Sequence, residues 1–374
     1  MSHLAEEYAK CCGVRIGKPV IKPHFFPVLV DRYITIHNDK KIQAKEYDFW
    51  PQVIDLLKPH LGDIKIIQIG SFGEERIKGT DVHLPTNSLK QCSYIIKNSL
   101  GHVGIDSVPV HIASALDKPV VGIYAHTYSS TCNPLWNKES KAITIESDRG
   151  GKRPSFALEE NPKTINLIKP EKIAQSVLEV LGIDEEIKER TVFMGPRSML
   201  ECIEVIPSEP TSFEGGPVSV RMDLHHNEEI LNQIIQFTPV EVTLNKPISS
   251  EILASKKIQR LTYEADSFDE EFVAVLTKFG INATLACSSS ENLEKERTKY
   301  FNCLIHRTKK DSVIKENREK LKDVNLNSLK IRSNKKIICG GEVYESLFDR
   351  NDRKNEDDFF IDLDWLMVYD ALDE

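Results

Sequence analysis

From residue 33 onward, strand-like and helix-like segments alternate along the chain, and this alternation constrains the fold more than any other feature. Short apolar runs are followed by longer stretches whose apolar residues recur at helical spacing. Because neighbouring parallel strands need a crossover helix, such a series predicts a doubly wound α/β sheet. The predicted strands are 33–38, 64–70, 100–106, 118–125 and 141–147, and the predicted helices are 48–61, 88–99, 109–117 and 169–182.

A second series with the same rhythm starts at residue 217, after a turn-rich stretch at 183–215. Its predicted strands are 217–223, 239–245, 258–264 and 281–288, and its predicted helices are 227–237, 249–256 and 269–280. A length of 374 residues suits two domains. We therefore expect two Rossmann-like domains facing a cleft. The expected boundaries are 1–30 for an N-terminal helix, capped by Ser2, with its connection, 31–190 for the first domain, and 191–374 for the second, with an acidic C-terminal helix.

The composition suits a globular protein without a membrane span. Hydrophobic residues make up 40% of the chain, and no run approaches the roughly 18 apolar residues that a span needs. The first residues are polar, so we expect no secretory signal. The eight cysteines are scattered without a Cys-x-x-Cys pair, which argues against a zinc ribbon or a disulfide framework. A cytoplasmic location is therefore expected.

Charge is distributed unevenly around a net value of −8. Residues 305–336 hold eleven Lys or Arg and four Asp or Glu, whereas residues 342–374 hold three and twelve. Opposed blocks of this kind are typical of solvated surface or of a mutual contact. A nucleic-acid groove on the basic block is an alternative, although no aromatic residue interleaves it.

Ligands of open parallel sheets bind at the carboxyl ends of the strands, and this rule selects candidate residues. In the first domain it selects the residues His37, Asn38, Gly70, Ser71, Asp106, Ser107, Ala125, His126 and Thr127. In the second domain it selects the residues Asp223, Asn245, Glu264, Cys287 and Ser288. Two such sheets would hold two substrates, one for each domain.

The window 100–136 is the most informative part of the chain. Asp106 and Ser107 end a predicted strand, and His111 lies one turn into the next helix. Backbone N–H groups at such a helix start suit a diphosphate, and His111 could donate to a phosphoryl oxygen. The alternative is structural: Asp106 caps the helix and His111 packs beneath it.

This window resembles the donor-binding half of glycosyltransferase family 9, the ADP-heptose:lipopolysaccharide heptosyltransferases. The matching residues occur in the family's order: Gly104, Asp106, Ser107, His111, Ala113, Ala115, Pro119 and Tyr124. Lys45 is the best match to the family lysine that contacts the donor phosphates. The resemblance covers about residues 30–182. It implies a GT-B architecture, a nucleotide-diphosphate-sugar donor as co-substrate, no other cofactor and no required metal.

The sequence departs from the family pattern in three places. Val108 and Ala125 stand where the family has glycine, and a side chain at 108 narrows the approach of a phosphate to the backbone. The order of domains also differs, because only about 30 residues precede the donor-like domain and a different α/β domain follows it. The catalytic carboxylate of the family's N-terminal domain therefore has no counterpart by position.

The second domain is then the expected source of the general base that transfer to a hydroxyl needs. Asp223 at a strand end is the first candidate, followed by His225 or His226, with Glu264 as an outside candidate. The alternative is that Asp223 orders a turn and the histidines lie on the surface.

The loop at 146–155 carries Arg149 and Lys152, which could neutralise a diphosphate leaving group. The alternative is an exposed basic loop without such a role. No His, Asp or Glu cluster has the spacing of a metal site.

We interpret the chain as a cytoplasmic, metal-independent glycosyltransferase that moves a sugar from a nucleotide-diphosphate donor to a hydroxyl, with inversion as the resemblance implies. Two alternatives are an enzyme like the nucleotide-sugar 2-epimerases and a non-catalytic module that binds sugar nucleotides. The acceptor is open: a lipopolysaccharide, a modified nucleobase, a protein side chain or a small glycan.

Overall fold

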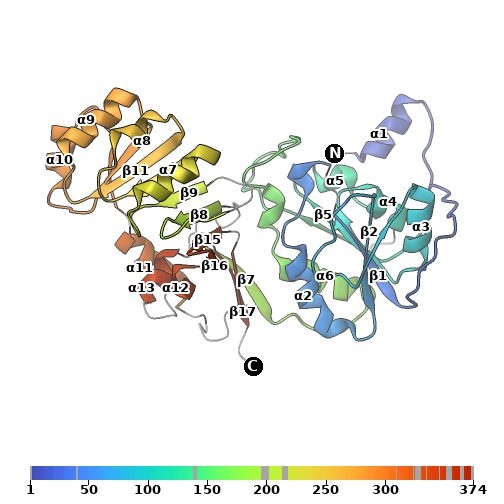
Figure 1. Ribbon diagram of the computed structural model, residues 1–374. Coiled ribbons are helices and arrows are strands. Elements are labelled where there is room, and N and C mark those ends of the chain that lie inside the picture. Colours follow the sequence, from blue (N-terminus) through green and yellow to red (C-terminus); the bar gives the residue numbers. More distant parts are fainter. Residues whose placement is uncertain are drawn as a thin grey trace. The chain divides into compact units, whose positions relative to one another are not determined.

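The computed structural model divides the chain into two compact units, residues 1–191 with 371–374 (unit 1) and residues 192–370 (unit 2). It describes residues 2–38, 41–137, 141–194, 202–212, 218–308, 310–322, 324, 330–333, 335–344, 346–350, 356–362 and 366–371. Both units are α/β with largely parallel sheets (Figure 1), so the predicted fold class is confirmed. That the two sheets face a common cleft stays a prediction.

Unit 1 is built on a six-stranded parallel sheet with the order β3-β2-β1-β4-β5-β6. All five strands predicted for this region are present. The sheet consists of β1 (Tyr33–His37), β2 (Lys65–Gly70), β3 (Val82–Pro85), β4 (His102–Ile105), β5 (Val120–Tyr124) and β6 (Ala142–Glu146). Every residue of β1, β4 and β5 is buried, as expected for strands that helices cover on both faces.

The helices of unit 1 begin where the sequence offers a cap or a proline. Ser88 caps α3 by accepting a hydrogen bond from the Gln91 N–H, and Pro51 and Pro170 occupy the first turns of α2 and α6. The helical segments are α1 (Leu4–Cys11), η1 (Gln43–Lys45), α2 (Trp50–Leu61), α3 (Leu89–Asn98), α4 (Val108–Ala115), α5 (Ser129–Cys132), η3 (Thr164–Leu167) and α6 (Pro170–Leu181).

Two details of unit 1 differ from the prediction. The cap of α1 is His3, whose Nδ1 accepts a hydrogen bond from the Ala5 N–H, and not Ser2. The strand β3 was missed because it is short, half-buried and ends in Pro85, at the edge of the sheet.

His102, the first residue of β4, carries a fully buried imidazole. Its Nδ1 lies 3.0 Å from Thr35 Oγ1, and its Nε2 has no hydrogen-bond partner in the described part of the chain. Burial, together with nearby His37, lowers the pKa of His102 to about 3. The folded protein therefore holds this side chain in its neutral form.

The buried His102 makes unit 1 sensitive to acid. The unfolded chain takes up a proton near pH 6.5, but the folded chain does so only near pH 3. Each pH unit below 6.5 should therefore cost about 1.4 kcal/mol of unfolding free energy, or about 2 kcal/mol at pH 5. Urea unfolding at pH 7 and pH 5 should show this loss in the wild type and a smaller one in His102→Asn. An equal pH dependence of the two proteins would contradict the assignment.

Unit 2 contains an eight-stranded sheet with the order β13-β12-β11-β10-β9-β8-β15-β16. Its strands are parallel except for the antiparallel pair of β15 and β16. They are β8 (Cys202–Ile206), β9 (Val218–Arg221), β10 (Val240–Leu244), β11 (Ile258–Ala265), β12 (Ala283–Cys287), β13 (Ile305–Arg307), β15 (Lys335–Cys339) and β16 (Glu342–Tyr344).

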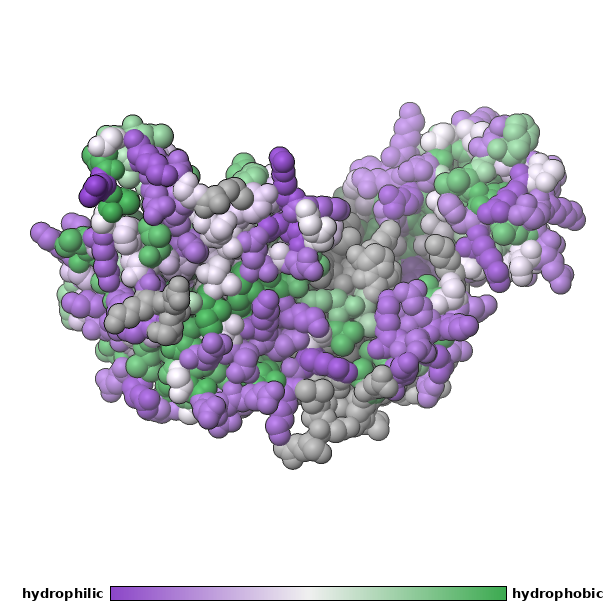
Figure 2. Space-filling view, turned by 180° about the vertical axis from the view of Figure 1, so that it is seen from behind, coloured by the Kyte–Doolittle hydropathy of each residue, from purple (hydrophilic) through white to green (hydrophobic). Residues whose placement is uncertain are grey.

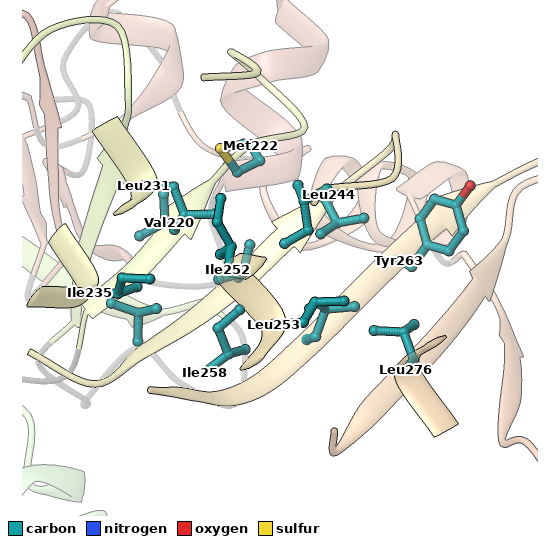
Figure 3. Packing of buried hydrophobic residues seen from close by; sticks show 14 of the residues in the cluster. Val220, Met222, Leu231, Ile235, Leu244, Ile252, Leu253, Ile258, Tyr263 and Leu276 are labelled. Atoms are coloured by element: carbon teal, nitrogen blue, oxygen red, sulfur yellow. The ribbon is translucent and has the colours of Figure 1, made fainter. Parts of the chain in front are cut away.

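The core of unit 2 lies between this sheet and the helices that the sequence predicted. In Figure 3, Leu231 and Ile235 of α7 (Glu228–Phe237) point toward Val220 of β9, and Leu276 of α9 (Glu270–Phe279) lies near Tyr263 of β11. The other helices are α8 (Ser250–Ala254), α10 (Leu293–Lys299), α11 (Lys310–Lys320), α12 (Leu347–Arg350) and α13 (Glu356–Asp362).

Two expectations for the ends of unit 2 are corrected. The stretch expected as a boundary loop contains β7 (Glu189–Phe193) and β8, so residues 217–223 are not the first strand. The expected acidic C-terminal helix is short, because α13 ends at Asp362 and β17 (Leu366–Ala371) pairs antiparallel with β14 (Lys330–Ser333). The strands β14, β17 and β7 form a separate three-stranded sheet.

The surface in Figure 2 mixes hydrophilic and hydrophobic residues. None of the helices in the described ranges has the length and apolar character that a membrane crossing needs. All eight cysteines are free thiols.

Candidate functional site

The order of strands in unit 1 opens a crevice at one place on the carboxyl edge of its sheet. The chain runs from β1 to β2 and β3 on one side, and then crosses to β4 on the other side of β1. Loops that leave β1 and β4 therefore diverge, and such a switch point is where ligands bind in α/β sheets. His37 ends β1, and Asp106 and Ser107 follow β4.

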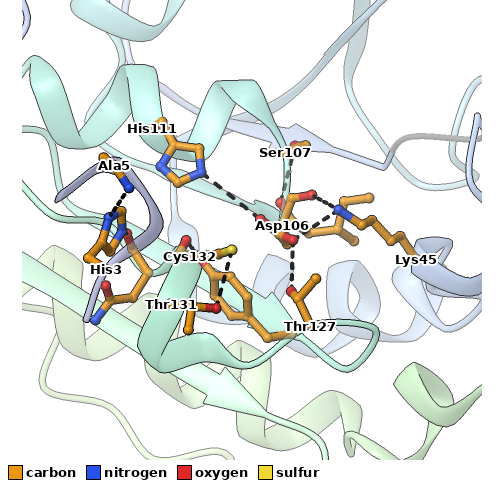
Figure 4. Close-up of polar contacts among 12 residues, drawn as sticks. His3, Ala5, Lys45, Asp106, Ser107, His111, Thr127, Thr131 and Cys132 are labelled. Atoms are coloured by element: carbon orange, nitrogen blue, oxygen red, sulfur yellow. Dashed lines mark hydrogen bonds and ion pairs between the residues drawn. The ribbon is translucent and has the colours of Figure 1, made fainter. Parts of the chain in front are cut away.

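Asp106 is the centre of a polar cluster at this switch point (Figure 4). Lys45 Nζ donates to Asp106 Oδ2 at 2.9 Å, and Thr127 Oγ1 donates to the same oxygen at 2.9 Å. His111 Nε2 lies 4.0 Å from Asp106 Oδ1, which is too far for a hydrogen bond. The structure thus brings together Lys45, Asp106, His111 and Thr127, all of which were predicted as binding residues. The structural alternative for Asp106, a helix cap, does not describe these contacts.

The Lys45 ammonium retains capacity for a ligand. Its recorded acceptors are Asp106 Oδ2 and, at 3.2 Å, the Asp106 carbonyl oxygen. An ammonium has three N–H donors, so a third can reach an incoming oxygen. The two charges are 17% and 12% exposed, which strengthens their interaction relative to a pair in water.

His111 is uncharged at neutral pH. Burial lowers its pKa, the Asp106 carboxylate opposes this, and the nearby basic groups of His3 and Lys45 lower it further. A neutral imidazole has one N–H donor and one acceptor nitrogen. With a side chain that is 39% exposed, His111 can offer that donor to a ligand.

The start of α4 differs from the expectation that its backbone N–H groups hold a diphosphate. Pro109 has no N–H, and the Val110 N–H already donates to the Ser107 carbonyl at 3.2 Å. Ser107 occupies the capping position, but its hydroxyl donates to the Ile105 carbonyl and lies 3.0 Å from His37 Nδ1. Side chains, and not the helix start, must therefore supply most of the donors here.

A cavity of about 260 Å³ is lined by Ser107, the residue that follows Asp106. It extends across the carboxyl ends of β1, β2, β3 and β4. Its lining residues include the predicted binding residues Gly70, Ser71 and Ser107, the strand-end residue His37 and the exposed Val108. Others were not predicted: Lys41, Glu74, Thr86, Asn87, Ser88, Leu89, Cys92 and Pro109.

Glu74 is the most informative of the residues that sequence reasoning missed. Its Oε1 accepts a hydrogen bond from the Ser71 N–H at 2.8 Å, while its buried Oε2 has no hydrogen-bond partner in the described structure. The carboxylate lies against Gly70, where a Cβ atom would come within 2.0 Å of Oε2. The absence of a side chain at Gly70 therefore leaves room for the Glu74 carboxylate in this position. A glycine at a strand end was the only local signal of this arrangement.

The loop with Arg149 and Lys152 lies apart from the Asp106 cluster in its contacts. Arg149 pairs with Glu146, donates to the Ala125 carbonyl at 3.0 Å, and stacks over Tyr128 at 5.6 Å from the ring centre. Its side chain is only 10% exposed, which describes a residue that holds its own loop. Lys152 is exposed. A role for either residue in stabilising a leaving group stays a prediction.

In unit 2, Asp223 is held by Arg221. The guanidinium donates to both carboxylate oxygens of Asp223 at 2.8 Å, and its Nη1 donates to Glu204 Oε2 at 3.0 Å. Asp223 and Glu204 are 7% and 9% exposed. Although burial opposes it, hydrogen bonds and charges from these carboxylates raise the pKa of Arg221. His225 is exposed. The base roles of Asp223 and His225 stay predictions.

Among the described residues, no group of three or more His, Cys, Asp or Glu is arranged to hold a metal ion.

Together, the parallel sheet, its switch-point crevice and the Asp106 cluster define the first unit as a Rossmann-like domain with a candidate site for a charged ligand. Residues 74–157 match the family model of glycosyltransferase family 9 (heptosyltransferase). The resemblance drawn from the sequence is thereby confirmed for this part of the chain. No curated protein matches the chain.

Solved structures of family 9 enzymes are also similar to the chain, although distantly. A family 9 glycosyltransferase from Veillonella parvula is 15% identical over 40% of this chain and 46% of its own, with a TM-score of 0.34. The dodecameric iron-containing glycosyltransferase TibC from enterotoxigenic E. coli is 16% identical over 46% and 50%, with a TM-score of 0.34. E. coli ADP-heptose lipopolysaccharide heptosyltransferase II is 17% identical over 48% and 52%, with a TM-score of 0.31. The chain thus spans about half the length of these structures.

Proposed function

We propose that the chain is a glycosyltransferase, with a nucleotide-diphosphate sugar bound by unit 1 and the acceptor bound by unit 2. The observation that carries this proposal is the place of Ser107. It lines the cavity at the ends of β1 to β4 and directly follows Asp106, the centre of the charged cluster. A ligand that extends from the cavity past Ser107 meets a cation and a neutral histidine. The family match of residues 74–157 supports the same reaction class.

Each part of such a donor has a suitable partner. The cavity offers Glu74 as an acceptor and Ser71 and Thr86 as hydroxyl groups, which suits the hydroxyl-rich nucleoside. The third N–H of Lys45 and the N–H of neutral His111 suit phosphoryl oxygens. The Asp106 carboxylate, already facing His111, suits a sugar hydroxyl. We infer that no metal ion and no further cofactor take part, and that the reaction occurs in the cytoplasm.

The proposed chemistry is a direct, inverting displacement. The acceptor oxygen bonds to the anomeric carbon, the bond from that carbon to the diphosphate oxygen breaks, and the hydroxyl proton passes to a general base. For the base we propose His225 ahead of Asp223, because both oxygens of Asp223 are held by Arg221 while His225 is exposed.

Nucleotide-diphosphate sugars should raise the thermal stability of the protein. A ligand at about a hundred times its Kd adds about 2.7 kcal/mol to the folded state, a shift of several degrees. His111→Ala should reduce the shift by removing one donor to the phosphates. His24→Ala, which truncates an exposed histidine outside the site, is the matched control and should keep the full shift. If no nucleotide sugar stabilises the wild-type protein, the proposal is wrong.

Product analysis separates the alternatives. Transfer requires an acceptor and releases the nucleoside diphosphate. An epimerase-like enzyme would instead convert the nucleotide sugar without any acceptor, and a binding module would leave it intact.

A further inference from the structure

Unit 2 contains a second cavity that the proposed reaction has not used. Its volume is about 530 Å³, and it lies where β12 and β13 end side by side, with Cys287 opposite Arg307 in the register. We call it the cationic pocket and define it by Ser288, Arg297, Arg307, Thr308, Ser312 and Lys315. Carboxyl ends of parallel strands are the usual location of ligands in such sheets.

The charge of this pocket is opposite to that of the whole chain, which is −8. Arg297 is paired with Glu294 at 2.8 Å. Within the residues that the structure describes, no acidic side chain forms an ion pair with Arg307 or Lys315. His306 and Asp311 also line the cavity, and Asp311 is its only acidic lining residue. Two cations are therefore available to a ligand.

Further donors face the same space. The hydroxyl-bearing residues Thr308 and Ser312 also line the pocket, as does Ser288, whose hydroxyl donates to the Asp266 carboxylate. Ser312 belongs to the first turn of α11, an eleven-residue helix whose positive dipole end lies at this cavity. Hydroxyl groups, a guanidinium, an ammonium and a helix start together form a site for a tetrahedral oxyanion.

We propose that the cationic pocket binds the phosphate group of a small phosphorylated saccharide or polyol, as the anionic handle of the acceptor. No Phe, Tyr or Trp lines the pocket, so it lacks the stacking platforms with which proteins bind single-stranded nucleic acid. The role as an acceptor site rests on the proposed glycosyl transfer. Phosphate binding by Arg307 and Lys315 does not depend on the proposed glycosyl transfer.

The test is a titration of the full chain with glucose 6-phosphate, with glucose as the uncharged reference. Arg307→Gln/Lys315→Gln should weaken glucose 6-phosphate binding about tenfold or more, because charged hydrogen bonds are lost. Lys278→Gln/Lys295→Gln removes the same charge from exposed positions outside the pocket and should bind as the wild type does. Added salt should weaken the binding, and glucose should not bind detectably.

The possible outcomes separate this inference from the proposed function. Unchanged glucose 6-phosphate binding in Arg307→Gln/Lys315→Gln overturns the pocket assignment, and a loss confined to Lys45→Met places the phosphate in unit 1 instead. Binding of oligothymidylate that requires Arg307, without binding of glucose 6-phosphate, overturns the ligand class. If phosphate binding requires Arg307 but no nucleotide sugar stabilises the protein, the assignment of the cationic pocket is supported and the proposed glycosyl transfer is contradicted.

Discussion

Replacing Arg221 with methionine should lower the unfolding free energy of unit 2 by about 3–5 kcal/mol, the largest loss that we expect from a single substitution. Arg221 donates to both oxygens of Asp223 and to Glu204, and all three side chains are less than one-fifth exposed. Without the guanidinium, the carboxylates of Asp223 and Glu204 lose the cation that they share, while both stay largely buried. Removing one partner of a buried ion pair costs this much because a buried charge loses its compensation.

Urea unfolding followed by circular dichroism measures this loss. The control is the triple variant Arg221→Met/Asp223→Asn/Glu204→Gln, which removes the unpaired charges and should recover most of the stability. A loss below about 1 kcal/mol in Arg221→Met would show a solvated, weakly coupled cluster. In that case Asp223 would again be the preferred candidate for the general base.

The fold was predictable from the sequence wherever strands are buried on both faces. Residues 64–70 and 118–125 are nearly continuous apolar runs, and the structure contains β2 and β5 there. Strands with mixed environments were missed. β3 is half-buried at an edge, and β8 carries the buried Glu204 in its middle, which hides its apolar pattern. The charge of Glu204 is compensated by Arg221 from the next strand, a long-range contact that no local pattern contains.

The candidate site was predictable only in part. The strand-end rule and the family pattern together selected Asp106, His111, Lys45 and Thr127, which the fold does bring to one cluster. Glu74 was not predicted as a site residue, because its position against Gly70 depends on how the loop after β2 folds back. The strand-end rule also selected Asp223. Its pairing with Arg221 could have been predicted from the sequence, because Arg221 lies two residues earlier and alternate residues of a strand share a face.

Replacing Lys45 with methionine should weaken binding of the nucleotide-diphosphate sugar by about 10- to 100-fold and slow transfer at least as much. A charge-assisted hydrogen bond contributes about 1.5–3 kcal/mol. Among the residues that the structure describes, Lys45 is the only cation paired with the Asp106 carboxylate, since His111 is neutral and lies 4.0 Å away. In Lys45→Met, the uncompensated charge of Asp106 would also repel the diphosphate. Isothermal titration with the donor measures the affinity, and steady-state kinetics measure transfer.

The double variant Lys45→Met/Asp106→Asn tests whether this repulsion is real. It removes both charges, so donor affinity should recover part of the loss seen in Lys45→Met, whereas purely additive effects would make the double variant the weaker binder. Lys169→Met, on the same unit and outside the Asp106 cluster, is the control for the loss of a lysine. Donor affinity equal to that of the wild type in Lys45→Met would place the diphosphate elsewhere, and the Asp106 cluster would then be a structural ion pair.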